Sequence, residues 1–382
     1  MDRIYLDYNA TTPVDPHVLE VMIGYYHAIY GNPSSIHWYG QIAKKVIDEA
    51  REKVASFIKA KSTEIVFTGS GTEADNLALF GIANMYRSSK KTKVIISAIE
   101  HHAVLNAAEE LQRNGLQVIK VPVNSDGVID MEKLRFLVDD SVLMISIMMA
   151  NNETGVVQPV EEIAKIAQEK GIIFHTDAVQ AAGKINIDVE RIGCSLLTIS
   201  AHKMYGPKGI GVLYINQKVK IYPMLFGGGQ ERGRRAGTEN LAGIVGFSKA
   251  CEICLQEYNE RERIKYLRDK LENILLNSLS YAVVHGRNVL RVPNTISVSF
   301  VGVDAEALVI DLDLHKVAVS TGAACSSGSI EPSHVLSAMN LPPEQLMSTI
   351  RISIGRFTTE DEINQAAQII ILSAEKIKNR LS

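Results

Sequence analysis

The sequence of 382 residues contains no apolar run long enough to cross a membrane. One of its longest apolar stretches, residues 143–150, has the length of a buried strand, whereas a membrane-spanning helix needs about 20 apolar residues. The charged residues at the N-terminus are not followed by a long apolar region, so we expect no signal peptide. We therefore expect neither a membrane protein nor a secreted one.

Cysteine is also scarce, with only four residues in the whole chain. Domains that depend on disulfides are much richer in cysteine, so we expect a reducing compartment, namely the cytoplasm.

Charge of one sign is not in large excess either, because the chain has 40 Lys and Arg residues and 43 Asp and Glu residues. Bulk charge therefore favours neither a nucleic acid nor an anionic membrane as a partner.

Hydrophobic residues make up 46% of the chain and charged residues 22%, as in ordinary globular proteins. From about residue 40 to residue 215, short apolar segments alternate with segments of helical spacing. This alternation predicts an α/β fold with a seven-stranded, mostly parallel sheet that helices cover on both faces. The expected strands lie at residues 65–68, 94–97, 118–123, 143–149, 172–175, 196–199 and 211–215.

The pattern changes after about residue 255. Residues 264–275 have the spacing of a long amphipathic helix, and Thr359 with Glu362 forms a capping-box pattern at the start of a last helix. Strand-like runs at residues 295–300 and 350–354 lie between these helices. We expect a large domain, followed by a smaller α+β domain. The predicted limits are 15–256 for the large domain, and 1–14 with 257–382 for the small one.

Polar residues follow five of the expected strands. Because the carboxyl ends of parallel strands meet at one edge of a sheet, where ligands bind, we expect these residues to form a single site. They are Gly71, Thr72, His101, Asn152, Asp177, Gln180, Ser200, His202 and Lys203.

Two of these segments suggest specific chemistry. Residues 69–72 contain two glycines at the start of an expected helix, where backbone N–H groups could bind a phosphate, although a plain turn explains such a motif alone more often. Lys203 has cationic neighbours, His202 and Lys208, which would help it to lose its proton for Schiff-base chemistry. An isolated loop lysine would more often be solvated.

Asp177 follows a buried strand, where a carboxylate needs a partner such as a pyridinium nitrogen, although a helix N-cap is an equally good explanation. His101 and His102 are adjacent, so the two side chains are not expected to share a metal ion. One of these rings is better suited to stacking on a flat cofactor. Cys251 and Cys254 form a single CxxC pair in a helical pattern, which favours helix packing over a metal site.

Cys325 lies within residues 320–329, a segment of small and polar residues that has few side chains to anchor it in a core. A cysteine in such a segment is expected to be exposed and mobile. A flexible loop with an incidental cysteine remains the alternative if no site lies nearby.

Taken together, these motifs resemble the cysteine desulfurases of iron–sulfur cluster biogenesis, which are fold-type-I enzymes dependent on pyridoxal 5'-phosphate, in the class-V aminotransferase superfamily. The resemblance covers almost the whole chain. It rests on residues 5–13, 31–35, 72–76, 100–101, 151–155, 175–180, 202–203, 227–231, 235–239, 325, 331–334 and 351.

The resemblance implies a role for each site residue. Lys203 would hold the cofactor, Asp177 would pair with its ring nitrogen, and His101 would stack on the ring and handle protons. Cys325 would take sulfur from L-cysteine as a persulfide, and could bind metal only as a cluster ligand during transfer. The remaining roles are ring or substrate contacts for Gln180 and Asn152, a substrate carboxylate contact for Arg351, phosphate contacts for Gly71, Thr72, Ser200 and His202, and a contact of Thr238 with the partner subunit's phosphate.

The resemblance also implies a homodimer and a sulfur acceptor such as an iron–sulfur scaffold protein. An aminotransferase or a selenocysteine lyase of the same fold is the first alternative, since neither activity is excluded by the cofactor site. For Arg351, a surface strand arginine is the alternative. A third hypothesis is a metal- or cluster-binding assembly protein that uses Cys251, Cys254 and the pair His101 and His102.

Overall fold

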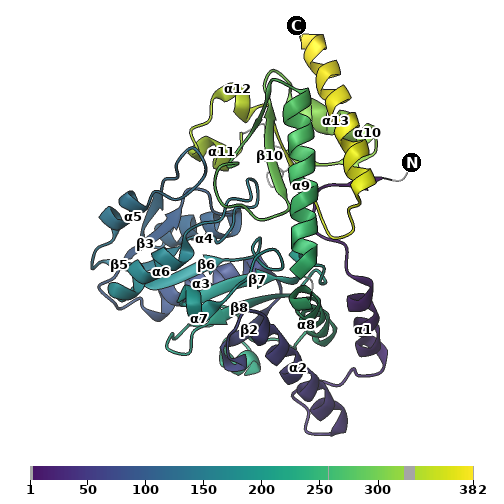
Figure 1. The fold of residues 1–382 in the computed structure, drawn as a ribbon. Helices are drawn as coiled ribbons and strands as arrows, with labels where there is room; N and C mark the ends of the chain where they lie inside the picture. Colours follow the sequence, from purple (N-terminus) through teal and green to yellow (C-terminus); the bar gives the residue numbers. More distant parts are fainter. Residues whose placement is uncertain (1–2, 257, 322–331, 382) are drawn as a thin grey trace.

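The computed structural model describes residues 3–256, 258–321 and 332–381. In this part of the chain a seven-stranded sheet forms the centre of the larger domain, with the strand order β2-β8-β7-β6-β5-β3-β4 (Figure 1). All neighbouring strands are parallel except the two pairs that β8 makes, with β2 and with β7. The predicted α/β class and mostly parallel sheet are therefore confirmed. The strands are β2 (Ile65–Thr68), β3 (Lys93–Ser97), β4 (Gln117–Val121), β5 (Val142–Ser146), β6 (Ile173–Asp177), β7 (Leu196–Ser200) and β8 (Gly211–Ile215).

Helices cover both faces of this sheet, which is why its strands are apolar on both sides. Residues of α2, α6, α7 and α8 share one core with one face, and residues of α3 and α4 share a second core with the other face. The helices of this domain are α1 (Pro16–His27), α2 (Trp38–Phe57), α3 (Gly71–Met85), α4 (His102–Arg113), α5 (Met131–Leu137), α6 (Val160–Glu169), α7 (Val189–Ile192) and α8 (Leu241–Gln256), with short 3₁₀ helices η1 (Ser62–Glu64), η2 (Ala201–Lys203) and η3 (Gln230–Gly233).

Three strand ends differ by two or more residues from the sequence-based expectation. β4 ends at Val121 because Pro122 has no N–H group to continue the ladder. β5 ends at Ser146, although the N–H groups of Ile147 and Met149 still donate to carbonyl oxygens of β6; on the other side, the N–H group of Met148 bonds the carboxylate of Glu100 at 2.8 Å. β6 continues to Asp177, so this carboxyl group lies on the strand itself.

The smaller domain contains a four-stranded antiparallel sheet of order β12-β13-β10-β9 and a core of its own. Near the N-terminus, β1 (Ile4–Tyr5) pairs in parallel with β11 (Val317–Ala318), so the first residues belong to this domain. Thr359 and Glu362 form the predicted capping box of α13. Where the two domains divide remains a prediction. The other elements are β9 (Ala282–Val284), β10 (Thr295–Phe300), β12 (Ser320–Thr321), β13 (Thr349–Ser353), α9 (Tyr258–Ser278), α10 (Ala305–Leu314), α11 (His334–Ala338), α12 (Pro343–Leu346) and α13 (Glu360–Leu381).

Figure 1 shows α9 and α13 side by side along the small domain, with α9 reaching toward the large domain. Among the described residues, none of the helices has the length and apolar character needed to span a membrane.

A buried ion pair fixes η3 to the large sheet. The guanidinium of Arg51 on α2 makes two bonds of 2.7 Å to the carboxylate of Glu231, and the N–H group of Phe67 on β2 donates to the same carboxylate at 2.9 Å. Glu231 and Arg232 have positive φ angles of 47° and 58°, which side chains other than glycine adopt at a cost. The ion pair therefore holds a strained turn against the edge strand of the sheet.

Replacing Arg51 with Met should lower the free energy of unfolding by about 3 kcal/mol, because the carboxylate of Glu231 would stay buried without its counter-charge. The measurement is the urea unfolding midpoint. Lys45→Met on the same helix is the matched control, since the Lys45 side chain is 77% exposed. Equal losses for the two variants would contradict the prediction.

Candidate active site

An open cavity of about 380 Å³ lies at the carboxyl edge of the large sheet, against the small domain. Residues of both domains line it, including Ser320 and Arg351 from the small sheet. The structure brings ten predicted site residues together on its wall, although they come from segments that are far apart in the sequence. These ten residues are Gly71, Thr72, His101, Asn152, Asp177, Gln180, Ser200, His202, Lys203 and Arg351.

One end of the cavity is formed by the N-terminus of α3, where backbone N–H groups can bind an anion. Ser70 caps α3 by accepting a bond of 3.1 Å from the N–H group of Glu73, which leaves the first N–H groups of the helix facing outward. A Cβ atom at Gly71 would lie 3.0 Å from a methyl group of Val179 and 3.4 Å from the Cβ of Ser200. The segment is therefore a helix N-terminus with a close backbone approach, rather than a plain turn.

Asp177 occupies the end of β6 and is 6% exposed. Its carboxylate accepts a bond of 2.8 Å from the N–H group of Val179. Burial raises the pKa of Asp177 to about 6, while the Val179 bond and the charge of Lys203 act in the opposite direction. The next helix begins at Val189, so the expected alternative of a helix N-cap is wrong. The buried acid can bind a cationic or N–H partner in the cavity.

Lys203 projects from η2, directly after the adjacent strand β7. Its ammonium group donates bonds of 2.6 Å to the carbonyl oxygen of Asn9 and 2.7 Å to that of Ala10. Its charge also lowers the pKa of both Asp177 and His101, which shows that the three groups share one electrostatic environment. An amine, a carboxyl group and an imidazole from three strands thus line one cavity.

His101 is the N-cap residue of α4. Its Nδ1 atom accepts a bond of 3.1 Å from the N–H group of Ala103, so a neutral ring carries its proton on Nε2. Burial, followed by the charge of Lys203, lowers the pKa of His101 to about 4, so the ring is neutral at pH 7. His102 turns away, and its ring centre lies 4.9 Å from that of His334. The two adjacent rings are tilted by 65° and do not form a ligand pair.

Arg351 lies on β13 and is 3% exposed, so it is not a surface strand arginine. Its guanidinium donates at 2.8 Å to the carboxylate of Asp7 and at 3.2 Å to the carbonyl oxygen of Asn152. Its Nε atom has no hydrogen-bond partner among the described residues. An oriented cation with an unused donor suits the binding of a carboxylate.

Two predicted residues are not found on this cavity. Thr238 is exposed and lines a separate cavity of about 120 Å³, together with Gly69 and Arg235. Cys325 lies outside the described residues, and with it the prediction of a catalytic thiol and cluster ligand. The structure describes the chain up to Thr321 and again from Pro332 onward.

The remaining candidates for metal binding do not form a centre. Cys251 and Cys254 are buried in α8, as the helical pattern predicted, and burial raises the pKa of the Cys251 thiol. In the described ranges, His, Cys, Asp and Glu side chains form no group of three that could hold a metal ion.

The sequence analysis gave no role to three residues of the site. Asn9 and Asp75 line the cavity, and Lys184 lies directly behind it. Asp75 is 1% exposed, and burial, with the nearby charge of Asp177, raises its pKa well above the usual range. The only signal for Asn9 and Asp75 was their position inside motifs that carried the family resemblance.

A family model described as aminotransferase class-V matches residues 4–366. The chain belongs to this family. A cysteine desulfurase IscS of Dictyoglomus turgidum is 45% identical over 377 residues, which cover 98% of this chain and 95% of that protein. A cysteine desulfurase of a Nostoc species is 44% identical, with coverage of 99% of this chain and 94% of that protein.

Solved structures of the family have the same fold. A NifS-like protein is 40% identical and superposes with a TM-score of 0.91, covering 97% of this chain and 98% of that chain. A structure described as SspA in complex with cysteine is 34% identical with a TM-score of 0.82, covering 93% of this chain and 100% of that chain. The predicted resemblance to cysteine desulfurases is therefore confirmed, together with the enzyme class.

Replacing Asp177 with Asn should stabilise the protein at pH 8 when no ligand is bound. Since the pKa of this acid is about 6 in the fold and about 4 in an unfolded chain, its ionisation disfavours the fold as pH rises through that interval. The expected gain in unfolding free energy is about 1–3 kcal/mol at pH 8 and close to zero at pH 4.

Urea unfolding at the two pH values measures this difference. Asp140→Asn is the control, because Asp140 is exposed and should show no such dependence. A gain that is equal at both pH values would contradict the raised pKa.

Proposed function

We propose that the chain is a cysteine desulfurase that uses pyridoxal 5'-phosphate to remove sulfur from L-cysteine and release L-alanine. The observation that carries the proposal is the convergence of the Lys203 amine and the buried Asp177 carboxyl group on one cavity. The cysteine desulfurases among its relatives, which match nearly the whole chain, support the same activity.

The cavity fits a flat, phosphorylated pyridine cofactor. Gly71, Thr72, Ser200 and His202 would bind the phosphate at the start of α3, where unpaired N–H groups face an anion. Asp177 needs a partner, and would keep a proton on the ring nitrogen. The bound cofactor supplies an electron sink for the substrate carbon.

The residues around this position would orient the substrate. Lys203 would hold the cofactor and later move a proton at the substrate carbon, while neutral His101 would lie at the ring and present its Nε2–H group. Arg351, already oriented by Asp7, would bind the substrate carboxylate with help from Asn152.

Sulfur transfer would require the thiolate of Cys325. This thiolate would attack the substrate sulfur, so that a sulfur–sulfur bond forms while the carbon–sulfur bond breaks. The bond's electron pair would stay on the carbon and take up a proton, giving alanine and an enzyme persulfide. Covalent geometry limits the distance of Cys325 from Thr321 to about 14 Å, and Ser320 of the same strand lines the cavity.

The persulfide would then pass to an acceptor such as an iron–sulfur scaffold protein, with Cys325 as a cluster ligand during transfer only. The cytoplasm is the proposed location of this reaction. An aminotransferase or selenocysteine lyase activity remains the alternative, because the same cavity could bind other amino acids.

Lys203→Ala should abolish the cofactor's yellow absorbance and reduce alanine release from cysteine by at least about 1,000-fold, because the protein loses its bond to the cofactor. Cys325→Ser should keep the absorbance but reduce sulfide release by a similar factor. Ser327→Ala is the control within the same segment. Full sulfide release by Cys325→Ser would contradict the assigned nucleophile, and retained transamination would favour an aminotransferase.

We also propose a homodimer, built around an aromatic patch on the connection between α1 and α2 and on the start of α2. Ile36 is 91% exposed there, and Trp38 and Tyr30 are largely exposed as well. Tyr39 packs on Tyr30 with ring centres 5.6 Å apart. A contiguous apolar surface of this kind is typical of a protein interface. The exposed position of Thr238, outside its own chain's cavity, supports a site completed across two subunits.

The double substitution of Ile36 and Trp38 by Glu should weaken the dimer at least about 10-fold, because two charges would be buried in the interface. Sedimentation measurements over a range of concentrations give the dissociation constant. Phe136→Glu is the control, since Phe136 is 82% exposed on α5, away from the aromatic patch. A monomeric wild-type protein would refute the proposal.

A further inference from the structure

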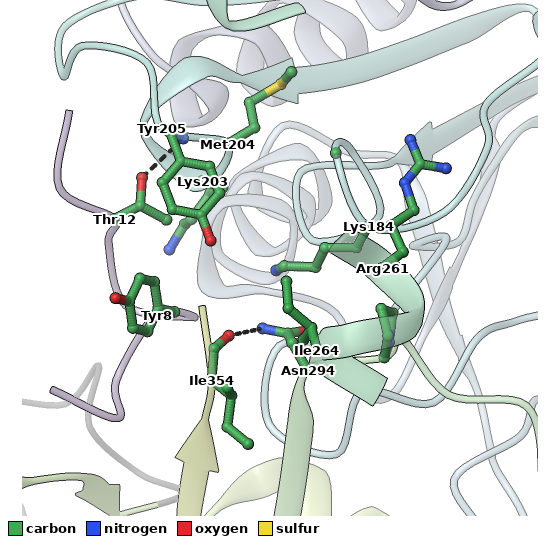
Figure 2. A pocket seen from close by; sticks show the side chains of 12 residues that line it. Tyr8, Thr12, Lys184, Lys203, Met204, Tyr205, Arg261, Ile264, Asn294 and Ile354 are labelled. Carbon is green, nitrogen blue, oxygen red and sulfur yellow. Dashed lines mark hydrogen bonds between the residues drawn. The ribbon is translucent and has the colours of Figure 1, made fainter. Parts of the chain in front are cut away.

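A second, smaller cavity of about 30 Å³ shares Lys203 with the main cavity. Figure 2 shows the side chains of Lys184 and Lys203 reaching into this space from different segments, with Asn294 of the small domain below them. Its volume is close to that of a single water molecule. Lys203 lines both cavities, and Lys184 lines the smaller one, where the reaction scheme gives it no role.

The ammonium group of Lys184 bonds two side-chain oxygens. It donates to Oε1 of Gln180 at 2.5 Å and to Oδ1 of Asn9 at 3.2 Å. The amide nitrogen of Gln180 donates at 2.9 Å to the backbone carbonyl of Asn9, which also accepts the bond from Lys203. Lys184, Gln180, Asn9 and Lys203 thus form one continuous hydrogen-bond network.

The orientation of the Asn9 amide is fixed from outside this network. Its nitrogen donates at 3.1 Å to the backbone carbonyl of Asn152 and at 2.8 Å to the hydroxyl of Thr295. The nitrogen of Asn294 donates at 3.0 Å to the Asn9 side-chain oxygen. Because a backbone carbonyl can only accept, the Asn9 side chain must present its oxygen to Lys184.

The orientation of the Gln180 amide follows from the same rule. Its nitrogen must face the backbone carbonyl of Asn9, and its oxygen must face the N–H donors of Lys184. The amide oxygen therefore accepts from Lys184, and one N–H group of Gln180 remains. Since Gln180 also lines the main cavity, that N–H group is the one available to a ligand there.

We propose that Lys184 is a positioning residue, which holds the Gln180 amide so that it can only donate a hydrogen bond to the ring oxygen of the bound cofactor. This inference rests on the proposed function. A donor at this point stabilises negative charge on the ring oxygen. The nitrogen that Lys203 contributes to the cofactor bond then loses its proton more easily.

Other charges face Lys184 as well. Burial, followed by the charges of Lys203 and Arg351, lowers the pKa of Lys184 well below the usual range for lysine. The network does not depend on full ionisation, because a neutral amine still has two N–H donors, one for each oxygen. The geometry therefore holds whether or not Lys184 carries its proton.

The test is a pH titration of the cofactor's visible absorbance in the dimeric, cofactor-loaded enzyme. Lys184→Met should shift the midpoint upward by about 1 pH unit, because the Gln180 amide is no longer held as a donor. Lys184→Arg, which keeps N–H donors, should return the midpoint most of the way to the wild-type value. Lys165→Met on α6 is the control, since Lys165 is exposed.

A double-mutant cycle distinguishes positioning from a general effect. If Lys184 acts through the amide, Lys184→Met should shift the midpoint less in a Gln180→Met background than in the wild-type background. If Lys184→Met does not fold, Lys184→Ala measured in the same way should give the upward shift. A midpoint equal to that of the wild-type enzyme in every folded variant would overturn the inference.

The wild-type measurements separate this inference from the proposed function. A wild-type enzyme with no visible absorbance and no alanine release would reject the proposed function itself. A normal wild-type absorbance with an unshifted midpoint in the Lys184 variants would reject only the positioning role.

Discussion

The buried charge of Asp177 is the constraint on which the site depends. A carboxylate at the end of a covered strand has lost most of its water, and its charge adds to burial in raising the pKa of the buried acids Asp75 and Glu100. The cations of Lys203 and Arg351 line the same cavity and offset this concentration of acids. The polarity of the site therefore follows from acids that the fold buries and from cations placed to balance them.

Both the large sheet and the N-terminal segment contribute to the assembly of this site. The parallel strands place their carboxyl ends at one edge, which brings Asp177, Ser200 and Lys203 together from successive strands. Residues 7–12 then cross between the domains, where Asn9 bonds groups of both. The position of the small domain is thus linked directly to the groups that surround Lys203.

The sheet and most of the site could be predicted because strand-length apolar runs and polar strand ends are local signals. The predicted ends of β4 and β5 were wrong because Pro122 cannot continue its ladder and because the N–H group of Met148 bonds the Glu100 carboxylate on one side of β5, and the second of these contacts is tertiary. The connection between Asn9 and Lys184 spans 175 positions and depends on amide orientation, which no local pattern reports. Residue roles such as that of Thr238 stay predictions, because they involve a second chain.

The pairing of β1 with β11 affects how the chain can fold during its synthesis. Ile4 leaves the ribosome long before its partner, Val317. At roughly 5–20 residues per second, the N-terminal segment would wait roughly 15–60 s for its neighbouring strand. The large sheet can form during that interval, so the carbonyl groups that bind Lys203 would reach their places only after that sheet has formed.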